Sequence, residues 1–145
     1  TIGPRMRVKD ARQTFVGVWL RALVEGRPFE VWDGRQRRDF TYVDDAVEAF
    51  LLAAIHPAAE GRVFNLGGPR PVTLQRLAEL LVEINGGGGF AVRTFPADRR
   101  KIDIGDYYAD DRLIGRVLGW RPRTGLREAL ARTLAYYRRE LRHYL

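Results

Sequence analysis

Residues 29–45 read FEVWDGRQRRDFTYVDD, and the local signals that decide the fold are concentrated in this stretch. Its first part, 29–32, is predicted to form a short strand, and Asp33-Gly34 is a strong turn signal. Residues 38–43 are rich in aromatic and β-branched side chains, which indicates extended backbone. Asp44 is a good N-cap for the helix that we expect next.

Amphipathic helices are predicted on both sides of this stretch. The first runs from about Ala11 to Glu25, where apolar residues recur at helical spacing and Gly26 ends the helix. The second follows Asp44 and stops at Pro57. One face of this second helix is predicted to carry Ala46, Val47, Phe50, Leu51 and Ala54.

The rest of the chain continues the alternation of strands and helices. Strands are predicted at 62–66 and 90–95, and a helix that Thr73 caps lies between them. A short helix that Asp110 or Asp111 caps ends at Gly119, and a last helix begins at Thr124. The sequence therefore predicts a small α/β fold over 1–145, a single domain with few short strands and several amphipathic helices. A neighbouring domain would explain what covers the remaining apolar helix faces.

Composition favours a folded protein, and its arginine content suits an anionic ligand. The chain has 145 residues, of which 46% are apolar and 30% charged, and its net charge is +7. All but two of its 25 basic residues are arginine, which binds phosphate in a bidentate manner. They are scattered along the chain, which argues against nucleic acid as a partner and leaves solvated helix faces as the alternative for most of them. The absence of a long apolar run or a signal-like N-terminus predicts a cytoplasmic protein without a membrane span.

The sequence contains no recognisable catalytic constellation. No tyrosine is followed by a lysine four residues later, and there is no phosphate-binding loop with a Gly-Lys-Ser/Thr ending. The glycine run at 86–89 follows a helix and not a strand, so it is unlike a dinucleotide-binding turn. His56 and His143 both fit helix ends, and no metal-ligand pattern is present. We therefore expect no catalytic, cofactor-binding or metal-binding residue, and a binding surface in place of a complete active site.

Several motifs resemble those of a known family. They are Gly3-Pro4-Arg5, the block Arg38-Asp39-Phe40-Thr41-Tyr42-Val43-Asp44-Asp45, Phe64-Asn65-Leu66-Gly67, Ala109-Asp110, Leu118-Gly119-Trp120-Arg121-Pro122 and the pair Tyr136-Tyr137. In this order they resemble the extended short-chain dehydrogenase/reductase enzymes, the NAD-dependent epimerases and dehydratases of nucleotide sugars. The resemblance covers essentially the whole chain, and the block at 38–45 is its most specific part.

The resemblance implies the C-terminal, substrate-binding portion of such an enzyme, similar to UDP-glucose 4-epimerase. It implies that NAD, a glycine fingerprint and a catalytic Tyr-x-x-x-Lys pair belong to a Rossmann domain upstream of residue 1. The implied substrate is a UDP-sugar or dTDP-sugar, converted through a 4-keto intermediate, and the fragment alone would be inactive. The alternative is a stand-alone sugar-nucleotide or anion-binding module without catalysis. A homodimer that uses uncovered apolar surface is also expected.

The resemblance also assigns roles to individual residues. Arg38 matches the arginine that binds the substrate diphosphate, and Arg100 and Asp103 match residues that contact phosphate and ribose. Trp32 falls where an aromatic ring lies near the base, and ordinary core packing is the alternative for it. Glu30 falls where the backbone meets the base edge. Val16 falls, together with Phe15, at a position that contacts the diphosphate in some epimerases.

Overall fold

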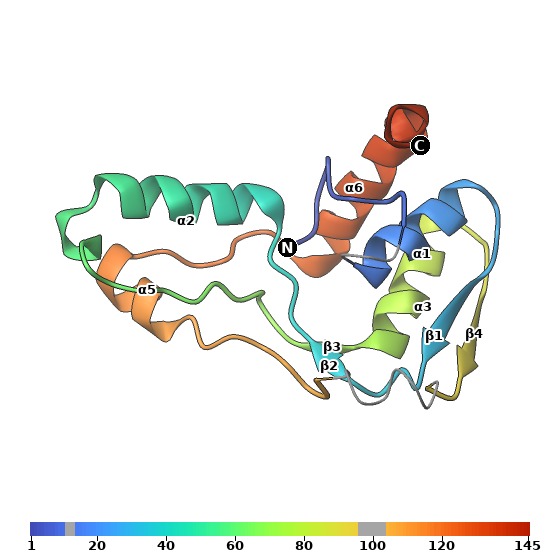
Figure 1. The fold of residues 1–145 in the computed structure, drawn as a ribbon, viewed down its shortest axis with the longest axis horizontal. Helices are drawn as coiled ribbons and strands as arrows, with labels where there is room; N and C mark the ends of the chain where they lie inside the picture. Colours follow the sequence, from blue (N-terminus) through green and yellow to red (C-terminus); the bar gives the residue numbers. More distant parts are fainter. Residues whose placement is uncertain (11–13, 96–103) are drawn as a thin grey trace.

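The computed structural model describes residues 1–10, 14–95 and 104–145 (Figure 1). Its helices are α1 (Phe15–Val24), α2 (Val43–Ile55), α3 (Leu74–Asn85), α5 (Arg112–Leu118) and α6 (Leu126–Glu140), with short 3-10 turns η1 (Pro57–Ala59) and η2 (Leu141–Tyr144). Its strands are β1 (Phe29–Trp32), β2 (Arg37–Arg38), β3 (Val72–Thr73) and β4 (Phe90–Arg93). This arrangement confirms the predicted α/β fold with few short strands.

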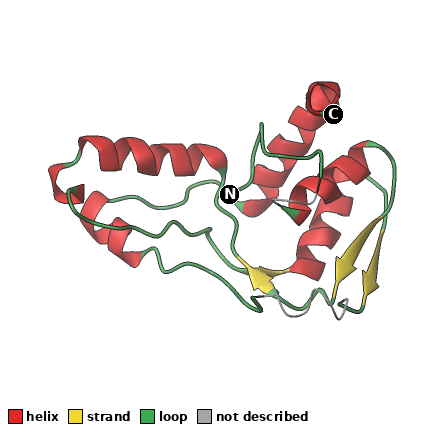
Figure 2. Cartoon of the chain, in the orientation of Figure 1, coloured by secondary structure: helices red, strands yellow, loops and turns green. Residues whose placement is uncertain are grey.

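The described strands form two small sheets at one side of the molecule (Figure 2). β1 pairs in parallel with β4, so that Phe29 lies opposite Phe90, and β2 pairs antiparallel with β3. Helices α1 and α3 pack against β1, and α6 packs against these two helices. The doubly wound parallel sheet of a Rossmann domain is not seen in the ranges that the structure describes.

The main core lies between α1, α3, α6 and β1. The side chains of Leu20, Leu77 and Leu130 are fully buried there, one from each helix. Thr73 caps α3 as predicted, because its hydroxyl oxygen accepts the backbone N–H of Arg76 at 3.1 Å. Gly86 ends the same helix in the left-handed conformation, with φ of 76°. The local signals and the apolar spacing therefore agree on this part of the fold.

A second, smaller core supports an extension formed by α2, η1 and α5, which projects from the main body (Figure 1). We call it the small core; its buried members are Ala49, Ile114, Leu118 and Trp120. Asp45, in the first turn of α2, connects this helix to the segment after α5. Its buried carboxylate accepts hydrogen bonds from the backbone N–H groups of Arg123 (3.2 Å) and Thr124 (2.9 Å) and from the Thr124 hydroxyl (3.2 Å).

Several predicted details of this extension and the predicted start of the last helix are wrong. α2 begins at Val43 after Tyr42, and Asp44 lies inside its first turn instead of capping it. The predicted strand at 62–66 is not formed, and we attribute this to the lack of a neighbouring strand to pair with it. The last helix begins at Leu126, because the Thr124 side chain bonds to Asp45 and does not cap.

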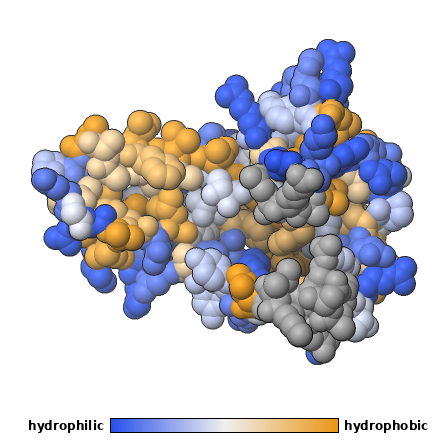
Figure 3. Space-filling view, viewed as in Figure 1, coloured by the Kyte–Doolittle hydropathy of each residue, from blue (hydrophilic) through white to orange (hydrophobic). Residues whose placement is uncertain are grey.

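Most of the apolar face predicted for α2 is exposed to solvent, and Ala46 is the buried exception. Ala46 and Ala49 are buried, whereas four larger apolar residues of the helix are exposed. Their exposed fractions are 48% for Val47, 71% for Phe50, 62% for Leu51 and 78% for Ile55. Figure 3 shows hydrophobic residues gathered on the surface of the extension. Such a continuous apolar patch on a folded domain marks a surface that contacts another surface.

Candidate functional site

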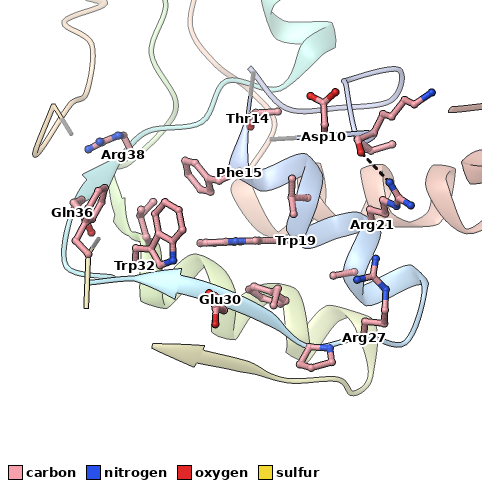
Figure 4. Close-up of a pocket in the computed structure, with 18 residues that line it drawn as sticks. Asp10, Thr14, Phe15, Trp19, Arg21, Arg27, Glu30, Trp32, Gln36 and Arg38 are labelled. Carbon is pink, nitrogen blue, oxygen red and sulfur yellow. Dashed lines mark hydrogen bonds between the residues drawn. The ribbon is translucent and has the colours of Figure 1, made fainter. Parts of the chain in front are cut away.

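The first candidate site is a pocket of about 880 Å³ between α1, β1 and the segment before α1 (Figure 4). A pocket of this size can hold a ligand as large as a nucleotide. Figure 4 shows Arg38 at one end, Arg21 and Arg27 at the other, and aromatic rings between them. The pocket thus combines cationic ends with an apolar middle.

The turn after β1 positions the pocket's central wall. Asp33 and Gly34 both have positive φ, 56° and 74°, as expected for a tight turn with a residue type that tolerates this conformation. The Asp33 carboxylate accepts the backbone N–H of Phe95 at 3.3 Å. This bond holds the Phe95 ring edge-on to Trp32, with ring centroids 5.5 Å apart. Trp32, a predicted base-stacking residue, therefore lines the pocket in a fixed orientation.

Arg38, the predicted diphosphate ligand, also lines the pocket. It lies on β2, and its guanidinium donates to the backbone carbonyl of Arg37 at 2.9 Å and to that of Gly105. The backbone of Arg38 also bridges to Tyr107. These contacts hold a half-buried, permanently charged group at the pocket's end, where it can meet an anion.

Glu30 lies on β1 and lines the same pocket, so the fold brings Glu30, Trp32 and Arg38 together. The Glu30 carboxylate is exposed and accepts from Arg93 of the paired strand β4 at 3.3 Å. Its side chain thus takes part in a surface ion pair between neighbouring strands. A contact between its backbone and a ligand, as the resemblance implies, remains a prediction.

Val16 is placed differently from these residues. Its side chain is buried in the main core and does not line the pocket, and its backbone N–H donates to the Thr14 hydroxyl at 3.3 Å. The neighbouring Phe15 does line the pocket, and the centroid of its ring lies 4.9 Å from that of the Trp19 ring. The predicted contacts of Arg100 and Asp103 fall outside the described residues.

Sequence reasoning missed the cations at the other end of the pocket. Arg21, on α1, donates to the backbone carbonyl of Lys9 at 2.9 Å and to the Glu25 carboxylate at 2.8 Å. Arg27 also binds Glu25. The two guanidiniums lower the pKa of Glu25 below its ordinary value, and the hydrogen bond from Arg27 contributes most. The sequence positions of Arg21, in a helix, and Arg27, in a turn, do not distinguish them from other arginines. They line one pocket because of the way α1 packs against β1.

The segment before α1 is held by the last helix. The buried Tyr137 of α6 donates its hydroxyl to the backbone carbonyl of Met6. Burial raises the pKa of Tyr137, so the phenol stays protonated and remains a donor at neutral pH. This bond fixes the chain just before Val8, Lys9 and Asp10, which form one edge of the pocket.

The described residues do not form a dinucleotide site of the Rossmann type. The glycine run at 86–89 lies between α3 and β4, the reverse of a strand-to-helix turn, and its first glycine is the C-cap of α3. Within the described ranges, no group of three His, Cys, Asp or Glu side chains is arranged to hold a metal ion. In the same ranges, no helix is long and apolar enough to cross a membrane.

Comparison with known proteins defines the class to which this fold and pocket belong. Residues 1–67 match the sequence model of the NAD-dependent epimerase/dehydratase family. UDP-glucuronic acid decarboxylase 1 of Xenopus tropicalis is 33% identical over 148 residues, which is 99% of this chain and 32% of that protein. UDP-D-apiose/UDP-D-xylose synthase 1 of Arabidopsis thaliana is 34% identical over 131 residues, 81% of this chain and 33% of that protein.

Solved structures agree with these relatives. The crystal structure of UDP-glucose 4-epimerase with UDP-glucose from Thermotoga maritima matches with a TM-score of 0.81 and 30% identity, over 96% of this chain and 43% of that one. The chain is therefore a member of the NAD-dependent epimerase/dehydratase family. It spans about a third of the length of these two curated relatives.

Proposed function

We propose that this chain is the substrate-binding part of an NAD-dependent nucleotide-sugar epimerase or dehydratase, of the UDP-glucose 4-epimerase type. The observation that carries the proposal is the pocket in which Trp32 and Arg38 lie together. A flat indole can stack on a nucleotide base, and a guanidinium can bind two oxygens of a diphosphate. The relatives' names support the proposal, because each of the three names a UDP-sugar.

In this proposal the residues of the chain bind and orient the substrate. Arg38 neutralises the diphosphate, Trp32 and Phe95 hold the base, and Glu30 borders it through the backbone of β1. Arg100 and Asp103 would add contacts to phosphate and ribose. Fixing the substrate in one position lowers the entropic cost of the reaction, which is a contribution to catalysis without proton transfer. The dinucleotide and the catalytic pair are assigned to another part of the enzyme, with residues 1–145 as one substrate-binding domain.

Calorimetric titration of the purified chain with UDP, dTDP and NAD tests the proposal. We expect UDP or dTDP to bind with about −4 to −6 kcal/mol, a dissociation constant between high micromolar and millimolar, because part of a site binds weakly. Arg38→Ala should abolish this binding. Arg37→Ala is the matched control, because Arg37 is adjacent on β2 and its side chain does not line the pocket.

The titration also separates the alternative functions. Binding that survives in Arg38→Ala as in Arg37→Ala would contradict the assigned role of Arg38. NAD binding tighter than UDP would contradict the substrate-binding assignment as a whole. A stand-alone binding module, the second candidate, predicts micromolar affinity for UDP-sugar without any need for further protein. A binding signal that falls steeply with salt and ignores base identity would instead indicate non-specific anion binding.

A further inference from the structure

A second cavity lies beside α5 and shares no lining residue with the first pocket. Its volume is about 740 Å³, large enough for a small organic ligand. The residues around it come from the start of the loop after 62–67, from α5 and from the segment after α5. The argument rests on Asp111, Arg112, Gly115, Arg116, Trp120 and Arg121, all of which line the cavity.

The arginines around this cavity differ in their partners. The Arg112 guanidinium binds the Asp110 carboxylate at two points, Nε to Oδ1 at 2.8 Å and Nη2 to Oδ2 at 2.5 Å. Arg116 and Arg121 form no hydrogen bond or close ion pair with any residue that the structure describes, although the charge of Arg116, after that of Arg112, helps to lower the pKa of Asp110. Both guanidiniums line the same cavity and carry the same charge, so an anion bound there would attract each of them.

Gly115 gives a second, independent reason to regard the cavity as a site. It lies inside α5, where glycine destabilises a helix relative to alanine. Packing does not require glycine there, because an added Cβ would meet only the Trp120 carbonyl oxygen, at 3.4 Å, an ordinary contact. Its φ is also not in the positive range that favours glycine. The missing side chain therefore leaves the cavity open at this point, at a cost to the helix.

We propose that this cavity binds the phosphate group of a small hydroxylated phosphate ester. The guanidiniums of Arg116 and Arg121 would bind the phosphate oxygens, which is the geometry that the arginine fork favours. Asp111, the acidic member of the lining, would accept a hydrogen bond from a hydroxyl of the same ligand. A carboxylate beside two arginines selects against a bare anion and in favour of an anion that carries a donor.

Titration of the full chain with sn-glycerol 3-phosphate and with methyl phosphate, a phosphate monoester that lacks a free alcohol hydroxyl, tests the proposal. We expect glycerol 3-phosphate to bind at least about threefold more tightly, and Arg116→Gln/Arg121→Gln to weaken it by at least about tenfold. Arg62→Gln/Arg139→Gln is the control, because it removes the same net charge from exposed arginines outside the cavity. Arg38→Ala should leave this binding unchanged, which separates it from the proposed nucleotide site.

Gly115→Ala supplies a test that does not depend on charge. The added methyl group should raise the melting temperature, because alanine favours the helix, and should weaken glycerol 3-phosphate binding by several fold. Equal loss of affinity in both double variants would assign the binding to net charge and overturn the proposal. So would a wild-type chain that binds neither probe, or a Gly115→Ala variant that binds as wild type does. Equal affinity for the two probes would overturn the role of Asp111.

Discussion

The two regions of the molecule bury their apolar residues to very different extents. The main body places side chains from three helices and a strand in one continuous core, and its pocket opens beside that core. Among the described residues, the buried members of the extension's core are Ala49, Ile114, Leu118 and Trp120, and the extension exposes larger apolar residues of α2 than it buries. The two regions thus differ in what holds them together.

Specific polar bonds compensate for the small apolar core in the extension. The indole N–H of Trp120 donates to the backbone carbonyl of Asp45 at 2.8 Å. The Asp45 carboxylate accepts from the backbone N–H groups of Arg123 and Thr124. A buried carboxylate is costly unless its hydrogen bonds are satisfied, so this arrangement is sensitive to the loss of any partner. The main body depends on apolar area, and the extension depends on one side chain.

Asp45→Ala should therefore destabilise the protein strongly, and more than the loss of any surface ion pair. Removal of the carboxylate leaves two partly buried backbone N–H groups without their acceptor, at about 3 kcal/mol in the free energy of unfolding. Urea unfolding followed by tryptophan fluorescence measures the loss. Asp44→Ala, on the exposed side of the same turn, removes only a favourable charge at a helix start and should cost less than about 1 kcal/mol. Equal effects of the two substitutions would show that the extension does not depend on Asp45.

The apolar face of α2 should control self-association and leave folding nearly intact. The homodimer expected from the sequence remains a prediction, and this face, with Phe50 and Ile55 the most exposed on it, is the surface we assign to it. Phe50→Ser/Ile55→Ser should weaken association at least about tenfold in sedimentation equilibrium, since buried apolar area drives such contacts. Val92→Ser, on exposed β4, is the control. A wild-type chain that stays monomeric at high concentration would contradict the assignment.

Local sequence signals predicted the main body better than the extension. Thr73 and Gly86 bound α3 as their residue types indicate, and 29–34 forms the expected strand and turn. The signals failed where distant residues compete for the same groups. Thr124 was expected to open a helix but bonds to Asp45, and 62–66 has strand-forming residues but no strand beside it. Apolar spacing identified the face of α2, but spacing alone cannot say whether that face is covered.

The sequence predicted those residues of the candidate site that lie in or next to a recognisable motif, and it did not predict the others. Glu30, Trp32 and Arg38 belong to the family-like block or precede it directly, and the fold brings them to one pocket. Phe95 and the arginines at the other end come from elements without a recognisable motif. Their positions follow from the β1–β4 pairing and from the packing of α1, which are tertiary contacts that no local pattern encodes.

Glu25→Gln tests the polar contacts at the edge of the main body, where we expect the smallest effect. Arg27 and Arg21 hold the pKa of Glu25 below its ordinary value of 4.5, so the folded state favours the charged form. The stabilisation is therefore complete above pH 4.5 and is lost as the pH falls through the lower, folded-state pKa. At pH 7 the variant should unfold about 0.5–1 kcal/mol more easily than wild type, and this difference should shrink in acid. Urea unfolding from pH 7 to pH 3 checks it. Glu79→Gln is the control, because its carboxylate contacts only the exposed side chains of Arg76 and Gln75 among the described residues, and it should cost less than Glu25→Gln. A difference that grew in acid would reverse the assigned direction of the Glu25 pKa.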